Sequence, residues 1–288
     1  MQDEIRLKVA IQKSGRLTEK SMNLLKESGI QIQGSKRRLT AIATNFPMDI
    51  VFLRDDDIPG YIEDGIADVG IIGENVYKEA NRKVIMTKKL GFASCRLSLA
   101  IPRGLTYTGL DYWNNKRIAT SYPMILQSYL SSKGIEAQIH SISGSVEVAP
   151  SLNLADGIFD IVSTGDTLLS NGLVEVEQVM KSEAILIEGI HLPTTKRQIL
   201  DKLLFRFEAS MAAKNNKYIL LNAPDDKLEE ISSLIPGMKS PSVFPLRDEG
   251  WSSIHSVVNE RDFWDVIDDL RELGAQGILV LPIEKMII

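Results

Sequence analysis

The sequence holds a single cysteine, Cys95, so no disulfide can form within one chain. Its three histidines, His140, His191 and His255, are too scattered for the ligand spacing of a zinc site. No stretch reaches the roughly 18 apolar residues of a membrane-spanning helix, and the first residues lack the apolar core of a signal peptide. We therefore expect a cytosolic protein with no structural metal and no membrane partner.

An excess of positive charge is also absent. The 33 Lys and Arg residues are outnumbered by 38 Asp and Glu residues, which gives a formal net charge of −5. Nonspecific nucleic-acid binding needs a broad basic face, so we expect no nucleic-acid partner. A polyanionic substrate would have to be bound by local clusters of cations. At 288 residues, 44% of them hydrophobic, the chain is long enough for two or three globular domains.

The N-terminal segment is predicted to form a strand over residues 7–11, a polar turn over 12–16 and a helix over 17–28. The turn contains Gly15 and two cations, Lys13 and Arg16. Backbone N–H groups at the start of a helix, with cations beside them, suit an anion. Taken singly, each of the two basic residues is more often an ordinary surface cation.

Residues 62–76 and 154–168 resemble each other. Five residues recur at the same spacing, namely Asp64, Gly65, Ile66, Asp68 and Gly73 in the first segment and Asp156, Gly157, Ile158, Asp160 and Gly165 in the second. Each segment is predicted to contain a helix that ends near Asp-Gly, a short apolar strand opened by an aspartate, and a glycine turn. The repeat favours two similar α/β lobes with a ligand crevice between them. Chance similarity of two helix–turn–strand units is the alternative.

Residues 217–288 follow a different plan. Apolar periodicity predicts strand, helix, strand, strand, helix and strand over 217–223, 226–234, 242–246, 252–258, 262–273 and 277–282. This βαββαβ order is the ferredoxin-like plan. A charged, amphipathic stretch over 194–215 is predicted to be a connecting helix. The whole chain is therefore expected to be α/β.

The strongest local signal for function is a strand that ends in small hydroxyl residues and glycine, followed by a helix. The residues that suit a phosphate there are Ser163, Thr164, Gly165 and Thr167, through their hydroxyls and unobstructed N–H groups. Asp160, within the strand, suits the hydroxyls of a ribose. A turn that only caps the next helix is the alternative.

Further candidates are single residues. Glu147, in a second glycine turn, suits a sugar hydroxyl or a hydrated cation, or else a capping role. Arg96 offers a planar fork to phosphate oxygens, or is a surface cation. Cys95 has no activating partner in the sequence, so we interpret it as a packing residue and not a nucleophile. The run 55–57, three aspartates, is predicted to cap the helix that begins at Ile58-Pro59 and not to bind a cation.

Taken in order, these motifs resemble the signatures of the ATP phosphoribosyltransferase family. The matching segments are 12–17 (QKSGRL), 54–59 (RDDDIP), 68–75 (DVGIIGEN), 95–97 (CRL), 117–123 (RIATSYP), 144–150 (GSVEVAP) and 162–165 (VSTG). Residues 279–286 (LVLPIEKM) resemble the C-terminal signature of the long form. The series runs along essentially the whole chain, so the ordered match is more specific than any single motif.

The resemblance implies a fold and a reaction. The fold is two lobes like those of periplasmic binding proteins, over 1–95 with 181–212 and over 96–180, followed by a regulatory domain over 213–288. The reaction joins ATP to 5-phosphoribosyl 1-diphosphate and releases diphosphate, as the first step of histidine biosynthesis. Mg²⁺ would arrive with the diphosphate. Histidine would inhibit as the end product, and the chain would form a homo-oligomer between a dimer and a hexamer.

The resemblance also assigns residues. The ribose and 5-phosphate would be held by Asp160, Ser163, Thr164, Gly165 and Thr167. The nucleotide and diphosphate side would be lined by Lys13, Gly15, Arg16, Arg54 and Arg96, with Lys13, Arg16 and Arg96 as catalytic residues, and Glu147 would bind substrate. The family's histidine site would fall on Asn222, Met238, Ser253 and Gly277. Asn222 departs from expectation, because a carboxylate would pair better with the ammonium group of histidine.

Two other classes of protein stay open. A solute-binding module with a similar cleft would need export, for which the sequence has no signal. Prephenate dehydratase, another two-lobed enzyme with a small regulatory domain, normally carries a Thr-Arg-Phe triplet that this sequence lacks.

Overall fold

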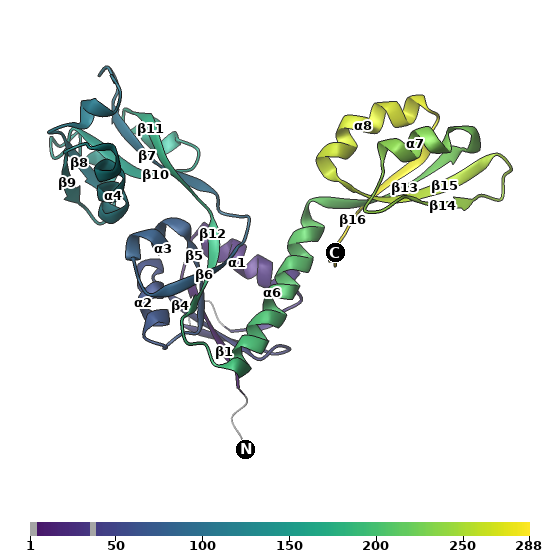
Figure 1. Ribbon diagram of the computed structural model, residues 1–288, viewed down its shortest axis with the longest axis horizontal. Helices are drawn as coiled ribbons and strands as arrows, with labels where there is room; N and C mark the ends of the chain where they lie inside the picture. The colour runs from purple at the N-terminus through teal and green to yellow at the C-terminus, as the bar shows by residue number, and fades with distance from the viewer. Residues whose placement is uncertain (1–4, 35–38) are drawn as a thin grey trace. The chain divides into compact units, whose positions relative to one another are not determined.

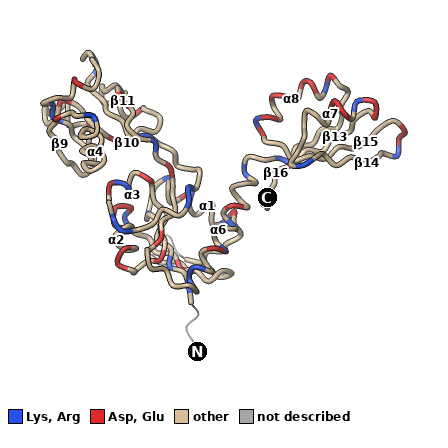
Figure 2. Tube along the Cα trace, in the orientation of Figure 1, with Lys and Arg blue, Asp and Glu red and all other residues tan. Residues whose placement is uncertain are grey.

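The computed structural model describes residues 5–34 and 39–288 (Figure 1). The chain forms two compact units, residues 1–23 with 31–199 and residues 24–30 with 200–288. The first unit contains two α/β lobes with separate sheets, and the second contains a four-stranded sheet. Within the described residues no helix combines the length and apolarity that crossing a membrane requires. Acidic and basic residues are interspersed along both units (Figure 2).

The first lobe is built on a seven-stranded sheet in the order β2-β3-β4-β1-β5-β12-β6. Its strands are β1 (Leu7–Gln12), β2 (Ile32–Gln33), β3 (Thr40–Ala43), β4 (Met48–Leu53), β5 (Val69–Gly73), β6 (Val84–Lys89) and β12 (Ala184–Gly189). Its helices are α1 (Arg16–Glu27), the 3-10 helix η1 (Asp55–Asp57), α2 (Ile58–Glu63) and α3 (Glu74–Ala80). The strand and helix predicted at the N-terminus are confirmed as β1 and α1. Because β1 is parallel to both β4 and β5, the turns after these strands lie at one edge of the sheet.

The second lobe has a five-stranded sheet in the order β11-β7-β10-β8-β9. Its strands are β7 (Cys95–Pro102), β8 (Arg117–Thr120), β9 (Gln138–Ser141), β10 (Gly157–Val162) and β11 (Leu173–Ser182). Its helices are α4 (Pro123–Lys133), α5 (Asp166–Ser170) and the 3-10 helices η2 (Leu110–Trp113) and η3 (Val146–Val148). Gly157 opens β10 where a Cβ would lie 2.6 Å from the Trp113 ring, so only glycine fits there. The lobe packs a separate core on each face of its sheet.

The two lobes repeat one unit, but in a different register from the one the sequence indicated. Asp68 accepts a hydrogen bond from the Lys8 N–H at 2.8 Å, and Asp156 accepts the same bond from the Arg117 N–H at 2.8 Å. Asp156 is therefore the counterpart of Asp68, and the sequence pairing of Asp68 with Asp160 is wrong. The expected helix before the second strand is also wrong, because only η3 and turns precede β10.

The predicted pairing of Gly73 with Gly165 is correct, because each is the N-cap of the helix that follows its strand. Gly73 is the N-cap of α3 and Gly165 is the N-cap of α5. Gly73 follows Asp68 by five positions, whereas Gly165 follows Asp156 by nine. The second lobe thus carries four extra residues between the start of the strand and the helix. Three of these residues form the loop over 163–165 and the fourth lengthens the strand, whereas β5 and α3 are adjacent in sequence and have no loop between them.

The chain passes between the lobes twice, from β6 to β7 and from β11 to β12, as expected for the fold of periplasmic binding proteins. A lobe-to-lobe contact joins α3 to α4. The Glu79 carboxylate accepts hydrogen bonds from the N–H groups of Met124 at 2.9 Å and Ile125 at 3.0 Å. The side chain at the N-cap of α4, Tyr122, does not cap the helix, so a carboxylate from the other lobe does so instead.

We expect Glu79→Ala to destabilise the first unit by about 1 kcal/mol, the usual contribution of a helix N-cap. The melting temperature should fall by about 2–4 °C for a unit of this size. Glu79→Gln keeps an acceptor and loses only the charge, so it should lie between the wild type and Glu79→Ala. Thermal unfolding followed by circular dichroism tests this order. Equal melting temperatures for all three proteins would contradict the capping role.

The second unit confirms the ferredoxin-like plan. Its elements are the connecting helix α6 (Thr194–Lys214), whose first turns belong to the first unit, β13 (Asn216–Pro224), the 3-10 helix η4 (Asp225–Lys227), α7 (Leu228–Leu234), β14 (Ser242–Pro245), β15 (Trp251–Asn259), α8 (Glu260–Glu272) and β16 (Gln276–Pro282). The sheet order is β14-β15-β13-β16, with every neighbouring pair antiparallel. Both α7 and α8 cover the same face of this sheet (Figure 1). The buried residues between them include Ile219, Ile231 and Phe263.

Candidate active site

The loop between β10 and α5 presents backbone N–H groups and hydroxyls on an exposed turn. Ser163 and Thr164 are exposed, and Gly165 adopts φ of +95°, a conformation that other residues rarely take. The Thr164 hydroxyl donates to the Asp166 carboxylate at 2.7 Å. Thr167 lies in the first turn of α5 and is also exposed. The structure thus brings the four predicted phosphate residues together on one turn.

Asp160 lies three residues before the loop, in β10. Burial, with a smaller contribution from the negative charge of Glu147, raises the pKa of the Asp160 carboxyl to about 6, although a hydrogen bond from the Ile161 N–H at 2.7 Å opposes both effects. Glu147 comes from η3 and is half-buried. Two carboxyl groups predicted to bind substrate therefore lie close enough to influence each other.

The other predicted group gathers in the first lobe, at the ends of β1 and β4. Lys13 and Arg54 line one pocket of about 370 Å³, together with Asp55 and Asp56. Gly15 adopts φ of +105°, a backbone conformation that would be strained for any residue with a side chain. Arg16 is the exposed first residue of α1 and does not line this pocket. Lys13 and Arg54 are therefore placed together, and Arg16 lies just beyond them.

The Tyr122 hydroxyl is affected by charges from both groups of predicted residues, those around β10 and those around Arg54. Burial raises the pKa of the Tyr122 hydroxyl, and the charges of Asp160 from the second lobe and of Asp55 and Asp56 from the first raise it further. The hydroxyl also accepts a hydrogen bond from the Asn75 amide at 3.2 Å. Charges from both lobes therefore act on one hydroxyl, at the contact of α3 with the start of α4.

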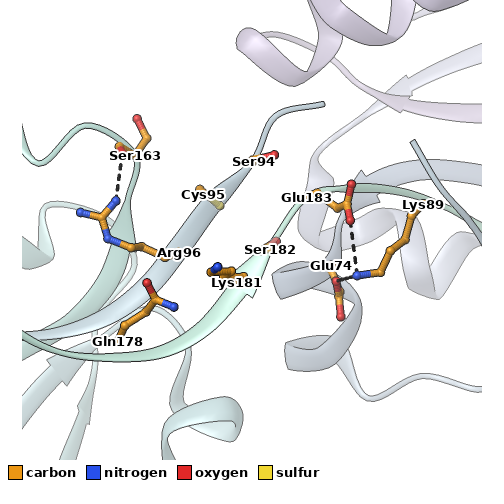
Figure 3. A pocket seen from close by; sticks show the side chains of 10 residues that line it. All are labelled: Glu74, Lys89, Ser94, Cys95, Arg96, Ser163, Gln178, Lys181, Ser182 and Glu183. Atoms are coloured by element: carbon orange, nitrogen blue, oxygen red, sulfur yellow. Dashed lines mark hydrogen bonds and ion pairs between the residues drawn. The ribbon is translucent and has the colours of Figure 1, made fainter. Parts of the chain in front are cut away.

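Arg96 lies on β7 and lines a second pocket of about 470 Å³, drawn in Figure 3. Its Nη1 atom donates to the Ser163 carbonyl at 3.1 Å, so it contacts the exposed loop directly. Two further cations, Lys89 and Lys181, line the same pocket. Lys89 is paired with Glu74 at 3.1 Å and Glu183 at 3.3 Å. The pocket therefore holds three cations beside the loop.

Two further predictions from the sequence concern Cys95 and the three aspartates at 55–57. Cys95 is half-buried in the same pocket, and burial raises the pKa of its thiol, which disfavours the thiolate. Asp57 does stand at the N-cap position of α2, but its side chain makes no capping hydrogen bond, so that part of the prediction is wrong. Burial and the neighbouring charges of Asp55 and Asp57 raise the pKa of the Asp56 carboxyl.

The described residues do not fit a resident metal ion. Across residues 5–34 and 39–288, no group of three or more His, Cys, Asp or Glu side chains is placed to hold one.

The residues predicted to bind histidine lie in the second unit. Asn222 on β13 is paired in register with Ser253 on β15, and a Cβ on Gly277 would lie 3.4 Å from the Asn222 amide nitrogen. Gly277 adopts φ of +60° at the start of β16. Met238 lies in the connection between α7 and β14 and is 54% exposed. Three of the four residues thus meet across adjacent strands, whereas Met238 comes from a separate loop.

Sequence reasoning missed two polar residues of this region. Glu175, on β11, pairs with Arg96 at 2.6 Å, and Asn75 bonds to both Tyr122 and Ser182. The partners of Glu175 lie 77 and 79 positions away along the chain. No local motif could have pointed to it. Tyr122 lay inside a recognised signature, but nothing in that segment marked its hydroxyl.

Comparison with known proteins gives consistent matches along the chain. The HisG family model, described as ATP phosphoribosyltransferase, matches residues 54–209, and the model of the HisG C-terminal domain matches residues 213–285. An ATP phosphoribosyltransferase from Bacteroides fragilis is 54% identical over 282 residues, 98% of this chain and 100% of that protein. One from Cytophaga hutchinsonii is 54% identical over 281 residues, 98% of each chain.

A solved structure agrees with these matches. A chain of the ATP phosphoribosyl transferase (HisG:HisZ) complex from Thermotoga maritima superposes with a TM-score of 0.60 at 31% identity, covering 70% of this chain and 98% of that one. Neither a solute-binding module nor a prephenate dehydratase accounts for such matches. With both family models present in order and relatives similar over nearly their full length, the chain belongs to the ATP phosphoribosyltransferase family, a family of pentosyltransferases, in its long form.

Proposed function

We propose that this chain joins ATP to 5-phosphoribosyl 1-diphosphate, giving 1-(5-phosphoribosyl)-ATP and diphosphate, as the first step of histidine biosynthesis. Atom N1 of adenine forms a bond to the anomeric carbon of the ribose. The bond from that carbon to the diphosphate oxygen breaks, and its electron pair leaves with the diphosphate. Since N1 already has a lone pair, the attack requires no general base. Positioning of the two substrates can supply roughly 7–11 kcal/mol in well-oriented systems.

The residues divide between the two substrates. Asp160 and Glu147 accept hydrogen bonds from the ribose hydroxyls, while Ser163, Thr164, Gly165 and Thr167 donate to the 5-phosphate. On the other side, Lys13, Gly15, Arg16 and Arg54 hold the nucleotide and the leaving diphosphate. Arg96, beside the loop, adds a cation where negative charge develops. Mg²⁺ enters with the diphosphate, because magnesium is usually bound through substrate phosphates and only one or two carboxylates.

A single observation carries this proposal. The second lobe has four residues more than the first between strand start and helix, and three of them form the Ser-Thr-Gly turn that follows the strand of Asp160. A turn whose only task was to cap α5 would not need the extra length, because α3 begins directly after β5. Incubating the protein with ATP, 5-phosphoribosyl 1-diphosphate and Mg²⁺ should release diphosphate only when both substrates are present. Release without ATP would contradict the proposal.

We expect Thr164→Val to raise KM for 5-phosphoribosyl 1-diphosphate by roughly ten- to a hundredfold, because one hydrogen bond to a charged group typically contributes about 1.5–3 kcal/mol. The change keeps the shape of the side chain and removes the hydroxyl. KM for ATP should change little. Thr106→Val makes the same change at an exposed threonine in the segment after β7, outside the loop, and serves as the control. Equal rises in both KM values for Thr164→Val would contradict the assignment of the loop.

For the second unit we propose feedback inhibition by histidine, bound near Asn222, Met238, Ser253 and Gly277, and a homo-oligomer between a dimer and a hexamer. The register pairing of Asn222 with Ser253 and the approach of Gly277 to Asn222 support one small polar site there. An alternative is that this domain only joins subunits. Inhibition by histidine that is not competitive with 5-phosphoribosyl 1-diphosphate favours the first role.

A further inference from the structure

Glu175, in β11, accepts three short hydrogen bonds. Its Oε1 atom accepts from Arg96 Nε at 2.7 Å and from the Ser98 hydroxyl at 2.7 Å, and its Oε2 atom accepts from Arg96 Nη2 at 2.6 Å. Arg96 and Glu175 are 29% and 26% exposed. The Arg96 guanidinium holds the pKa of the Glu175 carboxyl below its usual range. This two-bond, partly buried pair is therefore stronger than an ordinary surface ion pair.

The pair leaves part of Arg96 available. A guanidinium carries five N–H groups. Two of them bond to Glu175 and one, on Nη1, bonds to the Ser163 carbonyl. The remaining two N–H groups, one on each Nη atom, have no bond to a described residue. Arg96 therefore connects Glu175 to the first residue of the phosphate loop and still has donors for an anion.

The sheet separates Glu175 from the next glutamate along β11. A register shift between Glu175 and Glu177 interrupts the pairing of β11 with β7. The Glu177 carboxylate instead accepts hydrogen bonds from the hydroxyls of Tyr107 at 3.4 Å and Tyr129 at 3.5 Å, which belong to the aromatic core of the lobe. The two glutamates are thus close in sequence but have different partners, which makes Glu177 a matched control.

We propose that Glu175 is a positioning residue for the phosphoribosyl site, holding Arg96 against the Ser163 carbonyl so that the loop keeps its shape and two N–H groups stay available to phosphate oxygens. Glu175 contacts no reacting atom and acts only through Arg96. The identity of the anion as 5-phosphoribosyl 1-diphosphate rests on the proposed function. The connection between Glu175 and the loop rests only on the hydrogen bonds of Arg96.

The kinetic test compares Glu175→Gln with Glu177→Gln. We expect Glu175→Gln to raise KM for 5-phosphoribosyl 1-diphosphate by roughly ten- to a hundredfold, the usual result of a small misplacement of a binding group. KM for ATP should stay within about twofold, and Glu177→Gln should resemble the wild type in both constants. In an Arg96→Met background, Glu175→Gln should add no further loss. The proposal would be overturned if Glu175→Gln raised this KM in the Arg96→Met protein as much as it does in the wild type. It would also be overturned if Glu175→Gln and Glu177→Gln changed KM equally.

A second test needs no substrate. Hydrogen exchange of the backbone amides at 163–167 should be faster in Glu175→Gln than in the wild type, and unchanged in Glu177→Gln. Exchange in β8 and β13 should be the same in all three proteins, which excludes general unfolding. Unchanged exchange at 163–167 in Glu175→Gln would overturn the proposal. If the wild-type protein transfers no phosphoribosyl group, the proposed function fails, while this comparison still decides the role of Glu175.

Discussion

Replacing Asp160 with asparagine is expected to raise thermal stability at pH 7.5 and to weaken 5-phosphoribosyl 1-diphosphate binding by roughly ten- to a hundredfold. The affinity falls because a hydrogen bond to a charged acceptor contributes about 1.5–3 kcal/mol. The stability rises because burial and the Glu147 charge raise the pKa of the Asp160 carboxyl from 3.8 to about 6. The folded protein therefore disfavours the ionised form, and asparagine removes that charge.

The pH dependence of stability has a definite sign. Above pH of about 6 the Asp160 carboxyl is ionised in both the folded and the unfolded chain, so the destabilisation is fully present. As the pH falls from about 6 toward 3.8, the folded chain takes up the proton first, and the destabilisation disappears. The difference in melting temperature between Asp160→Asn and the wild type should therefore be larger at pH 7.5 than at pH 4.5.

Glu147→Gln serves as the control for the pH dependence of stability only, because Glu147 is itself proposed to bind the ribose. It removes the neighbouring charge and leaves Asp160 buried, so the pKa of the Asp160 carboxyl should fall only slightly and most of the pH dependence should remain. Melting curves at the two pH values and binding of 5-phosphoribosyl 1-diphosphate by calorimetry measure both effects. An Asp160→Asn protein that melts earlier than the wild type at pH 7.5, or that binds equally well, would contradict the role given to Asp160.

Asn222→Asp is expected to lower the histidine concentration for half-inhibition by about tenfold, since a carboxylate pairs with an ammonium group more strongly than an amide does. Asn222 lies beside Ser253 and Gly277, where the proposed histidine site would be. Coupling between separated sites typically amounts to about 1–3 kcal/mol, so inhibition should be substantial in the wild type as well.

The control for this change is Asn215→Asp, which adds the same charge where α6 meets β13. It should leave the half-inhibitory histidine concentration unchanged. Initial rates at several histidine concentrations, with both substrates saturating, measure the effect. A wild-type enzyme indifferent to millimolar histidine would contradict feedback inhibition, and equal effects of the two aspartate variants would place the site elsewhere.

The parts of the fold that depend on local sequence could be predicted well. In the second unit every predicted strand and helix is present within two residues of its expected bounds, because apolar periodicity and flanking glycines are local signals. The repeat between the lobes was recognised, but its register was wrong by four residues at the strand. Asp-Gly turns look alike in sequence, and only the hydrogen bonds to the Lys8 and Arg117 N–H groups identify the equivalent aspartates.

The site was only partly predictable for a related reason. The loop over 163–165 directly follows its strand, so a local motif of small hydroxyl residues and glycine identifies it in the sequence. Glu175 and Glu79 act on residues of other elements, and their positions depend on strand pairing, register shifts and the contact of α3 with α4. Such partners are set by the tertiary fold and leave no pattern at short spacing.

The most direct test of the proposed function is the structure of the product. After incubation with ATP, 5-phosphoribosyl 1-diphosphate and Mg²⁺, the nucleotide should carry one phosphoribosyl group on N1 of adenine with its triphosphate intact, and one diphosphate should be released for each nucleotide modified. Mass spectrometry and NMR of the purified nucleotide measure both. Recovery of unmodified ATP together with ribose 5-phosphate and diphosphate, or a phosphoribosyl group on another atom, would contradict the account.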